Sequence, residues 1–342
     1  MKFSVIIPLY NKAPYIRKAL ESVLAQTYTD YEVIVVDDGS TDDSTRIAEE
    51  YIREVKGYRL EVKGEENSKT DTNAYNLSPI NYKLIRQANA GVSAARNNGV
   101  AQSHGEYIAF LDADDWWEPT YLERMAQLIE DYPDAGLYAC NYVYYKLGKT
   151  HVVLNIPTGY INYPKAYYEG GAMPVWTGAA IMPRAVSDEM GGFPLGIKLG
   201  EDFLLWAKIA MHHPVAFLNE PLAYYNNDVP VNLRATRNLH HPNNHMLFRM
   251  DSIASSLSPL ASNLKSDWQA LLDKLRVNGL LEYWMSKEYH DIAAQELAKV
   301  DWSKQPENVK RIYKTPIWML KAKRQVMKWG SAVKQVIIKV IG

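Results

Sequence analysis

The sequence has a single cysteine, Cys140, among 342 residues, so the chain cannot form an internal disulfide. No cluster of cysteine and histidine has the spacing of zinc ligands. Both absences fit a protein of a reducing compartment. Residues 1–8 hold one lysine and a short apolar run that Pro8 interrupts, which is too short for a signal-peptide core or a membrane span. We therefore expect the protein to begin in the cytoplasm.

The chain also has little net charge, at −1, but that charge is unevenly distributed. Residues 308–342 hold nine Lys or Arg and no Asp or Glu, and subtracting these nine charges from −1 leaves −10 for the rest. An acidic body argues against nucleic acid along the main cleft. In the tail, apolar residues from Met319 to Val340 recur at spacings near three and four, mostly apart from the lysines. This pattern predicts a basic amphipathic helix, either peripheral on an anionic membrane surface or packed on the protein.

Composition otherwise matches an ordinary globular protein, with 47% apolar and 23% charged residues. A chain of this length suits one large domain, or one domain with an appendage. We predict a first domain over residues 1–230, with halves at 1–118 and 119–230. A mainly helical region is predicted over 231–342, ending in the basic tail.

Residues 1–111 alternate between short apolar runs and amphipathic segments. The apolar runs are rich in β-branched residues, which predicts buried strands at 3–7, 32–36, 82–86 and 106–111. Helices are predicted to begin at Pro14, at Thr41 or Asp42, and at Gly91. This alternation predicts parallel strands joined by helices. Residues 56–80 are polar and lack a clear period, so we expect a surface excursion there.

The remainder of the chain is less regular. A helix is predicted from Pro119 to about Glu130, and a strand over residues 136–145. Residues 151–230 show short strands and glycine-rich turns, with one clear helix over about 201–211. Residues 243–300 have a helical pattern, and prolines then break the chain before a last helix.

Four segments with polar or acidic residues adjoin the predicted strands in a fixed order. They are Val5-Ile6-Ile7-Pro8-Leu9-Tyr10-Asn11, Val35-Val36-Asp37-Asp38-Gly39-Ser40, Asn89-Ala90-Gly91-Val92-Ser93-Ala94-Ala95-Arg96-Asn97 and Leu111-Asp112-Ala113-Asp114-Asp115. Together they resemble family 2 glycosyltransferases of the GT-A fold, over about residues 1–225. The resemblance implies an α/β fold with a Rossmann-like mixed sheet sandwiched by helices, and a helical carboxyl-terminal extension. It also implies a catalytic domain whose nucleotide-binding half is 1–118 and whose acceptor half is 119–230.

The segments supply what a nucleotide-sugar donor needs. Its base needs a flat surface, its ribose needs carboxylate acceptors, and its pyrophosphate needs a divalent cation. Tyr10 can stack on the base, and Asp38, or Asp37, can accept from its ring N–H, with Arg96 or Asn97 completing the pocket. For Asp37 and Asp38 the alternative role is helix capping. The whole set assigned to the donor is Pro8, Tyr10, Asn11, Asp37, Asp38, Asn89, Arg96, Asn97, Asp112 and Ala113.

The carboxylates between Asp112 and Asp115 would repel one another without a cation, so we infer a metal. Oxygen ligands suit Mg²⁺ or Mn²⁺. The family's Asp-X-Asp motif matches Asp112-Ala113-Asp114, which implies that Asp112 lies near the ribose and Asp114 on the metal. Asp115 follows directly, so the ligand could be shifted by one residue. In many GT-A enzymes a later histidine completes the coordination, and the candidates here are His240, His241 and His245.

A catalytic base must take a proton from the acceptor hydroxyl, opposite the leaving diphosphate. Glu201-Asp202 resembles the family's Glu-Asp motif, which makes Asp202 the base and Glu201 its neighbour or substitute. The alternative is that both only favour a helix amino terminus. Upstream, Trp176-Thr177-Gly178 is assigned to the sugar and acceptor pocket, where Trp176 would offer sugars an apolar face or serve in the core.

These assignments predict an inverting transferase that moves a hexosyl or N-acetylhexosaminyl group. The expected donor is a UDP-sugar, and the acceptor a hydroxyl of a glycan or lipid-linked molecule in cell-surface polysaccharide synthesis. Trp206 follows Leu204-Leu205, so the Gln-X-X-Arg-Trp signature of processive synthases is missing, and transfer of one or a few residues is expected. The alternative is a non-catalytic module that binds nucleotide sugars or glycans with the same fold. A dehydrogenase is excluded, because no Gly-X-Gly-X-X-Gly follows the first strand.

Overall fold

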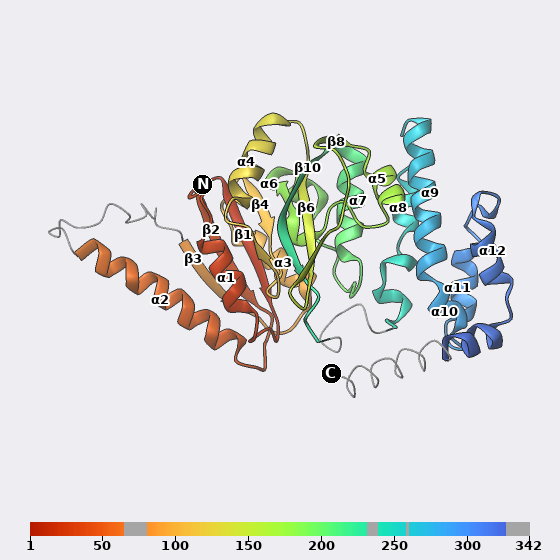
Figure 1. Cartoon of the computed structure of the whole chain (residues 1–342), viewed down its shortest axis with the longest axis horizontal. Coiled ribbons are helices and arrows are strands. Elements are labelled where there is room, and N and C mark those ends of the chain that lie inside the picture. Colours follow the sequence, from red (N-terminus) through yellow and green to blue (C-terminus); the bar gives the residue numbers. More distant parts are fainter. Residues whose placement is uncertain (65–80, 231–238, 258–259, 326–342) are drawn as a thin grey trace. The chain divides into compact units, whose positions relative to one another are not determined.

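The computed structural model describes residues 1–64, 81–230, 239–257 and 260–325 (Figure 1). The chain divides into two compact units, Met1–Trp268 and Gln269–Gly342, with the division inside helix α9 (Ser262–Gly279). The central sheet of the first unit ends at Asn226, close to residue 230, where the sequence-based domain limit was set. That limit describes the end of the sheet and stays a prediction, whereas the compact unit extends to Trp268.

The amino-terminal half of the first unit is a parallel sheet in the order β3-β2-β1-β4. Its strands are β1 (Phe3–Leu9), β2 (Tyr31–Asp37), β3 (Asn81–Arg86) and β4 (Tyr107–Phe110), joined by α1 (Ile16–Leu24), α2 (Ser44–Gly64) and α3 (Val92–Ala101). Every residue of β1 and β2 is buried, as expected for strands covered on both faces. The chain steps outward twice and then returns past β1, and this reversal places a ligand crevice at the carboxyl ends of β1 and β4.

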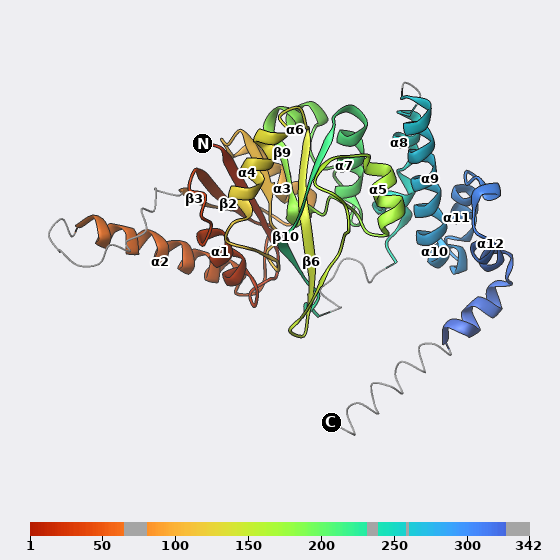
Figure 2. The same ribbon diagram turned by 45° about the horizontal axis from the view of Figure 1, so that its top comes forward.

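The other half of the sheet mixes strand directions. β9 (Ala180–Pro183) runs antiparallel to both β4 and β6 (Leu137–Lys146), while β10 (Val215–Asn226) runs parallel to β6. Short strands complete it: β5 (Trp116–Trp117), β7 (Lys149–Val152) and β8 (Gly159–Ile161). Figures 1 and 2 show helices against this sheet, among them α4 (Tyr121–Asp131), α6 (Arg184–Met190) and α7 (Glu201–His212). Helix α5 (Tyr163–Gly170) packs beside α7, where Tyr167 contacts Phe203. The predicted mixed sheet sandwiched by helices is confirmed.

One element differs from its prediction. Helix α2 continues to Gly64, so the expectation of an irregular excursion is wrong for residues 56–64. Weak periodicity suggested a loop, but these residues are mostly Arg, Leu, Glu, Val and Lys, several of which are strong helix formers. The rest of that predicted excursion, residues 65–80, lies outside the described part of the chain.

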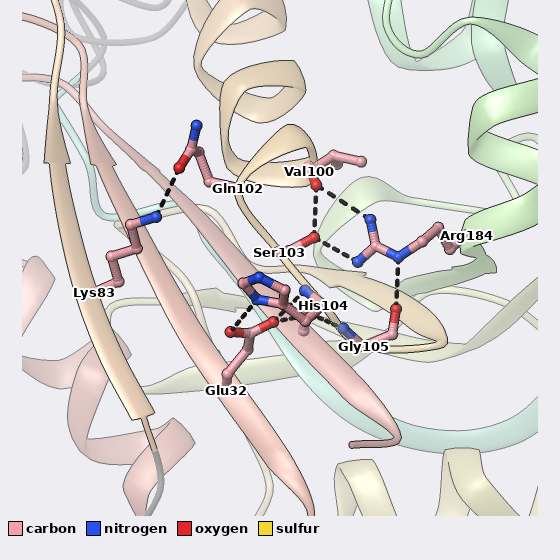
Figure 3. Close-up of polar contacts among 9 residues, drawn as sticks. Glu32, Lys83, Val100, Gln102, Ser103, His104, Gly105 and Arg184 are labelled. Atoms are coloured by element: carbon pink, nitrogen blue, oxygen red, sulfur yellow. Dashed lines mark hydrogen bonds and ion pairs between the residues drawn. The ribbon is translucent and has the colours of Figure 1, made fainter.

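The amino edge of the parallel sheet is held by a dense set of hydrogen bonds (Figure 3). The buried Glu32 carboxylate accepts from the Ser4 hydroxyl at 2.7 Å and from the His104 amide at 2.5 Å. The Arg184 guanidinium donates to the Gly105 carbonyl at 2.8 Å and to the Ser103 hydroxyl at 2.7 Å. These contacts fix the turn between α3 and β4, and therefore the start of β4.

Helices follow the sheet, as predicted. The first unit continues through the short helices η4 (Pro242–Asn244), η5 (Met246–Phe248) and α8 (Asp251–Ser255). The second unit contains the end of α9, then α10 (Leu281–Met285), α11 (His290–Leu297), η6 (Trp302–Lys304) and α12 (Glu307–Lys314). A further helix occupies 317–325, and the predicted amphipathic continuation over 326–342 lies outside the described residues. No described helix combines the length and apolar character needed to cross a membrane.

Candidate active site

A cavity of about 560 Å³ opens at the carboxyl ends of β1, β2 and β4. This is the edge where loops and helix amino termini converge in an open α/β sheet. Most of the residues assigned to the site from the sequence line it: Pro8, Tyr10, Asp38, Asn89, Arg96, Asp112, Ala113, Asp114, Asp115, Glu201 and Asp202. The structure thus brings together segments that lie almost 200 positions apart in the sequence.

Tyr10 and Asp38, which were assigned to the base of the donor, both line the cavity. The Tyr10 ring is 47% exposed, so a flat face is open to a ligand. The Asp38 carboxylate accepts from the amides of Ala90 and Gly91, both at 2.8 Å, and from the Gln87 side chain at 2.7 Å. Gly91 has a φ of 89°, a backbone conformation that favours glycine, and this turn brings its amide to Asp38. Asp38 therefore shapes the turn before α3 and also lines the cavity.

Three residues assigned to the donor lie outside the cavity lining. Asp37 accepts from the Ser40 amide in the turn after β2 and from the Thr45 hydroxyl in the first turn of α2. The Asn11 side chain accepts from the Thr41 amide at 2.8 Å and so ties the β1 turn to the β2 turn. Asn97 exchanges two hydrogen bonds of 2.8 Å with the Phe193 backbone. All three side chains thus bind neighbouring groups of the protein, and a direct donor contact by any of them stays a prediction.

Arg96 joins the two acidic motifs. Its guanidinium is almost fully buried and donates to Asp112 at 2.7 Å and to Glu201 at 2.9 Å. Its Nε has no hydrogen-bond partner, although that atom is buried. Burial lowers the pKa of Arg96, but the two carboxylates outweigh that effect, so the net shift is upward and the side chain stays charged. Arg96 therefore sets the position of Asp112 relative to Glu201.

Lys12 supplies a second cation that sequence reasoning missed. Its ammonium group lies 2.6 Å from the Asp114 carboxylate, inside the cavity. Burial raises the pKa of Asp114, and Lys12 opposes that rise. Asp115 is buried, and its carboxylate accepts from the Asn226 amide at 2.8 Å. Burial and the neighbouring carboxylates of Asp114 and Asp112 raise its pKa well above the usual range. The repulsion that suggested a metal is thus already reduced by Lys12 and Arg96.

The carboxylates still suit a divalent ion. Within the described residues, no three Asp, Glu, His or Cys side chains are grouped so as to hold a metal by themselves. Mg²⁺, however, is often held by one or two carboxylates together with substrate phosphates. Asp114 and Asp115, the predicted ligands, both line the cavity, and their role as ligands stays a prediction. Of the three candidate histidines, His240 lines the cavity, whereas the ring nitrogens of His241 and His245 accept from the amides of Asn243 and Leu247.

Asp202, the predicted base, also lines the cavity. It is the second residue of α7, and the preceding Gly200 has a φ of 82° and leaves no room for a Cβ beside the Met246 side chain. One oxygen of Asp202 accepts from its neighbour's amide at Phe203, 2.8 Å away, and the other from the Thr177 hydroxyl at 3.1 Å. Burial, followed by the charge of Glu201, raises the pKa of Asp202 to about 6. A carboxylate with that pKa is mostly ionised at neutral pH and retains useful basicity.

The Glycosyl transferase family 2 model matches residues 4–191, more than half of the chain. The chain belongs to glycosyltransferase family 2. The resemblance drawn from the four motifs is confirmed, and so, at the level of the family, is the enzyme class of glycosyltransferase.

Relatives of this family 2 chain include two bacterial proteins. It is 38% identical over 167 residues to the putative glycosyltransferase EpsH of Bacillus subtilis, covering 48% of this chain and 41% of EpsH. It is 32% identical over 239 residues to the glycosyltransferase GlyA of Streptococcus pneumoniae, covering 66% of this chain and 30% of GlyA. The chain thus spans less than half the length of these curated relatives.

The fold has close counterparts among solved structures. Residues 1–349 of TarS from S. aureus, in complex with UDP-GlcNAc, superpose with a TM-score of 0.68 and 21% identity. The match covers 91% of this chain and 84% of the TarS chain. At that identity the likeness shows the fold alone, and it agrees with the GT-A architecture expected from the sequence.

Several lining residues escaped sequence reasoning. Lys12, Lys198, Tyr225 and Asn226 all line the cavity. Lys12 stands one residue beyond the first motif, so its position after Asn11 was an available signal. The others had none, since they follow no motif and enter the site only because β10 and the turn before α7 end there.

Proposed function

We propose that the family 2 chain transfers a hexosyl or N-acetylhexosaminyl group from a UDP-sugar to a hydroxyl of a glycan or lipid-linked acceptor, with inversion, in polysaccharide synthesis. The observation that carries this is one cavity lined by nucleotide-type contacts at Tyr10 and Asp38, by the Asp112 and Asp114 carboxylates, and by Asp202. The UDP-GlcNAc complex of TarS, which shares the fold, supports the choice of nucleotide.

The residues assigned to the donor bind and orient the UDP-sugar. Tyr10 stacks on the base, Asp38 accepts from its ring N–H, and Asp112 accepts from the ribose. Lys12 and Arg96 place two positive charges on the wall that the diphosphate faces. Fixed charges of this kind stabilise a leaving diphosphate as its negative charge develops. We also propose that Asp114, or Asp115 beside it, holds Mn²⁺ or Mg²⁺ together with the diphosphate. Such an ion would neutralise part of the leaving group's charge.

The acceptor half activates the nucleophile. Asp202 takes the proton of the acceptor hydroxyl as its oxygen forms a bond to the anomeric carbon, and the bond from that carbon to UDP breaks. Thr177 and the Phe203 amide hold the carboxylate while it does so. A single displacement from the face opposite the leaving group inverts the anomeric configuration. Glu201 is the neighbour of this base and is held by Arg96, and its negative charge helps to raise the pKa of Asp202.

The test is a screen of nucleotide sugars with Mn²⁺ and an acceptor panel, followed by Asp202→Asn. We expect turnover with a UDP-sugar, a loss of about a thousandfold in kcat for Asp202→Asn, and unchanged UDP affinity. Asp188→Asn, on the exposed face of α6, is the matched control and should be fully active. Product with retained configuration would remove Asp202 from the role of base. UDP binding without turnover of any sugar would favour the non-catalytic module.

For the tail we propose peripheral binding to an anionic membrane on the cytoplasmic side. Trp318 is 71% exposed in a helix rich in Lys and Arg, which suits a lipid surface. The Tyr313 hydroxyl donates to the Val277 carbonyl, and Arg324 pairs with Glu282, so packing of this segment within the second unit is the competing role. Deleting residues 317–342 spares Tyr313 and should abolish binding to phosphatidylglycerol vesicles. Equal vesicle binding by the full and truncated chains would contradict the proposal.

A further inference from the structure

Four aromatic rings form a closed set in the acceptor half. Tyr142 and Tyr144 come from β6, Tyr225 from β10, and Trp176 from the segment before helix η1 (Thr177–Ala179). Around the set, the ring centroids are 5.2 Å apart for Tyr142 and Trp176 and 5.3 Å for Trp176 and Tyr225. They are 5.4 Å apart for Tyr225 and Tyr144 and 5.7 Å for Tyr144 and Tyr142. Each ring therefore contacts two others.

Strand pairing explains why the rings meet. Tyr142 and Tyr144 are two positions apart, so they share one face of β6. Parallel pairing sets Tyr225 directly beside Tyr144, and side chains opposite one another on neighbouring strands are in contact. The Trp176 ring completes the set and packs against Gly178. A Cβ at residue 178 would lie only 2.4 Å from the tryptophan ring. The glycine of the predicted Trp-Thr-Gly segment is thus explained by the position of this ring.

The four rings extend from the proposed catalytic base, Asp202, to the protein surface. Tyr225 lines the same cavity as Asp202, and Thr177, next to Trp176, donates to the Asp202 carboxylate. Tyr142 and Trp176 are 2% and 8% exposed, while Tyr144 is 37% exposed. The buried rings of Tyr142 and Trp176 pack against the other two and hold them in place. The Tyr142 hydroxyl is itself fixed, because it donates to the Met173 carbonyl at 3.1 Å. Tyr144 then presents an aromatic surface to solvent that core packing does not require.

This surface fits one class of acceptor. One face of a pyranose ring carries C–H groups that pack well on an aromatic ring, and its rim carries hydroxyls that stay in water. A phosphate group bound at Tyr225 would instead share the cavity with the Asp202 and Glu201 carboxylates. We propose that Tyr144 and Tyr225 form an acceptor subsite that binds a pyranose ring, so the acceptor is a glycan and not a bare lipid phosphate. This rests on the proposed function for the identity of the base.

The experiment is saturation-transfer NMR on the whole chain, with UDP and the methyl glycosides of glucose, galactose and N-acetylglucosamine as probes. We expect a glycoside to receive saturation on one ring face in the wild type. In Tyr144→Ala its affinity should fall about fivefold, as expected when one aromatic contact is removed. Tyr144→Phe keeps the ring and should bind as the wild type does.

Tyr160→Ala is the matched control. Tyr160 is 50% exposed and pairs with Ala216, near the start of β10, while Tyr225 lies near its end. It should leave glycoside binding unchanged. The subsite would be wrong if Tyr144→Ala and the wild type bound the glycosides with equal affinity. It would also be wrong if UDP received saturation and no glycoside did. Saturation of a glycoside that depends on Tyr144, with none of UDP, would support the subsite and contradict the proposed donor.

Discussion

Arginine and carboxylate side chains have different roles at the two ends of the parallel strands. The strands begin at the amino edge of the sheet and end at its carboxyl edge. At the amino edge, Arg184 donates from all three of its nitrogens, to Gly105, Val100 and Ser103 (Figure 3). At the carboxyl edge, Arg96 pairs with two carboxylates and leaves its buried Nε without a hydrogen bond. One edge is saturated with protein contacts, and the other faces a cavity of about 560 Å³.

The carboxylates show the same contrast. Burial raises the pKa of Glu32, but hydrogen bonds from Ser4 and His104 outweigh that effect, so its net shift is downward. Burial and Glu201 together raise the pKa of Asp202 to about 6. Where hydrogen bonds outweigh burial, the ionised carboxylate stabilises the fold, whereas a carboxylate whose burial and neighbouring charge outweigh its hydrogen bonds keeps the capacity to take a proton. Variants at the two edges should therefore separate loss of stability from loss of activity.

The largest effect is expected for Arg96→Met. It leaves Asp112 and Glu201 without their shared cation in a nearly buried site, which should cost about 3 kcal/mol of unfolding free energy and most of the turnover. Urea unfolding and initial rates measure the two losses. Adding Glu201→Gln removes one of the unpaired charges, so the double variant should recover part of the stability. If stability were unchanged in Arg96→Met, the bridging role would be wrong.

Arg184→Met is the counterpart at the amino edge. It removes donors from two backbone carbonyls and from the Ser103 hydroxyl, and we expect a loss of about 2 kcal/mol in unfolding free energy. The folded fraction should keep the wild-type KM for the donor, because none of these partners lines the cavity. A raised KM at full folding would show that the two edges are coupled.

The parallel half of the fold and the location of the cavity could be predicted from the sequence, because the motifs and strands are local patterns. Apolar runs located β1, β2, β3 and β4, and acidic segments after strands located the cavity. The sequence did not reveal which residues face it. Asn11 and Asn97 belong to the motifs, but their side chains form hydrogen bonds with backbone groups. Lys12 and Tyr225 lie outside the motifs, and both line the cavity. Such choices depend on partners distant in the sequence, which no local pattern specifies.

A smaller effect is expected when the pH is changed, both on kcat/KM and on the unfolding temperature. The base must be ionised, so kcat/KM should rise as pH passes about 6 and fall about tenfold for each unit below it. The raised pKa also means that protonation of Asp202 stabilises the fold, and this contribution is lost as pH rises through 6. Asp202→Asn should consequently unfold at a higher temperature than the wild type at pH 8, and at nearly the same temperature at pH 4. Thermal scans at both values, with Asp188→Asn as control, measure this difference.

The smallest effect is expected for His104→Ala, which tests how the amino edge holds Glu32. The imidazole Nδ1 lies 3.5 Å from the Glu32 carboxylate, but its side chain is 76% exposed, so water screens the attraction. The stronger contact is the His104 backbone amide, which alanine retains. Urea unfolding at pH 7 should therefore show a loss of at most about 0.5 kcal/mol. Ser4→Ala is the matched comparison, since Ser4 is buried and both donates to Glu32 and accepts from the Gly105 amide. It should cost more than His104→Ala, and the reverse order would show that the exposed ring, not the buried bonds, secures this edge.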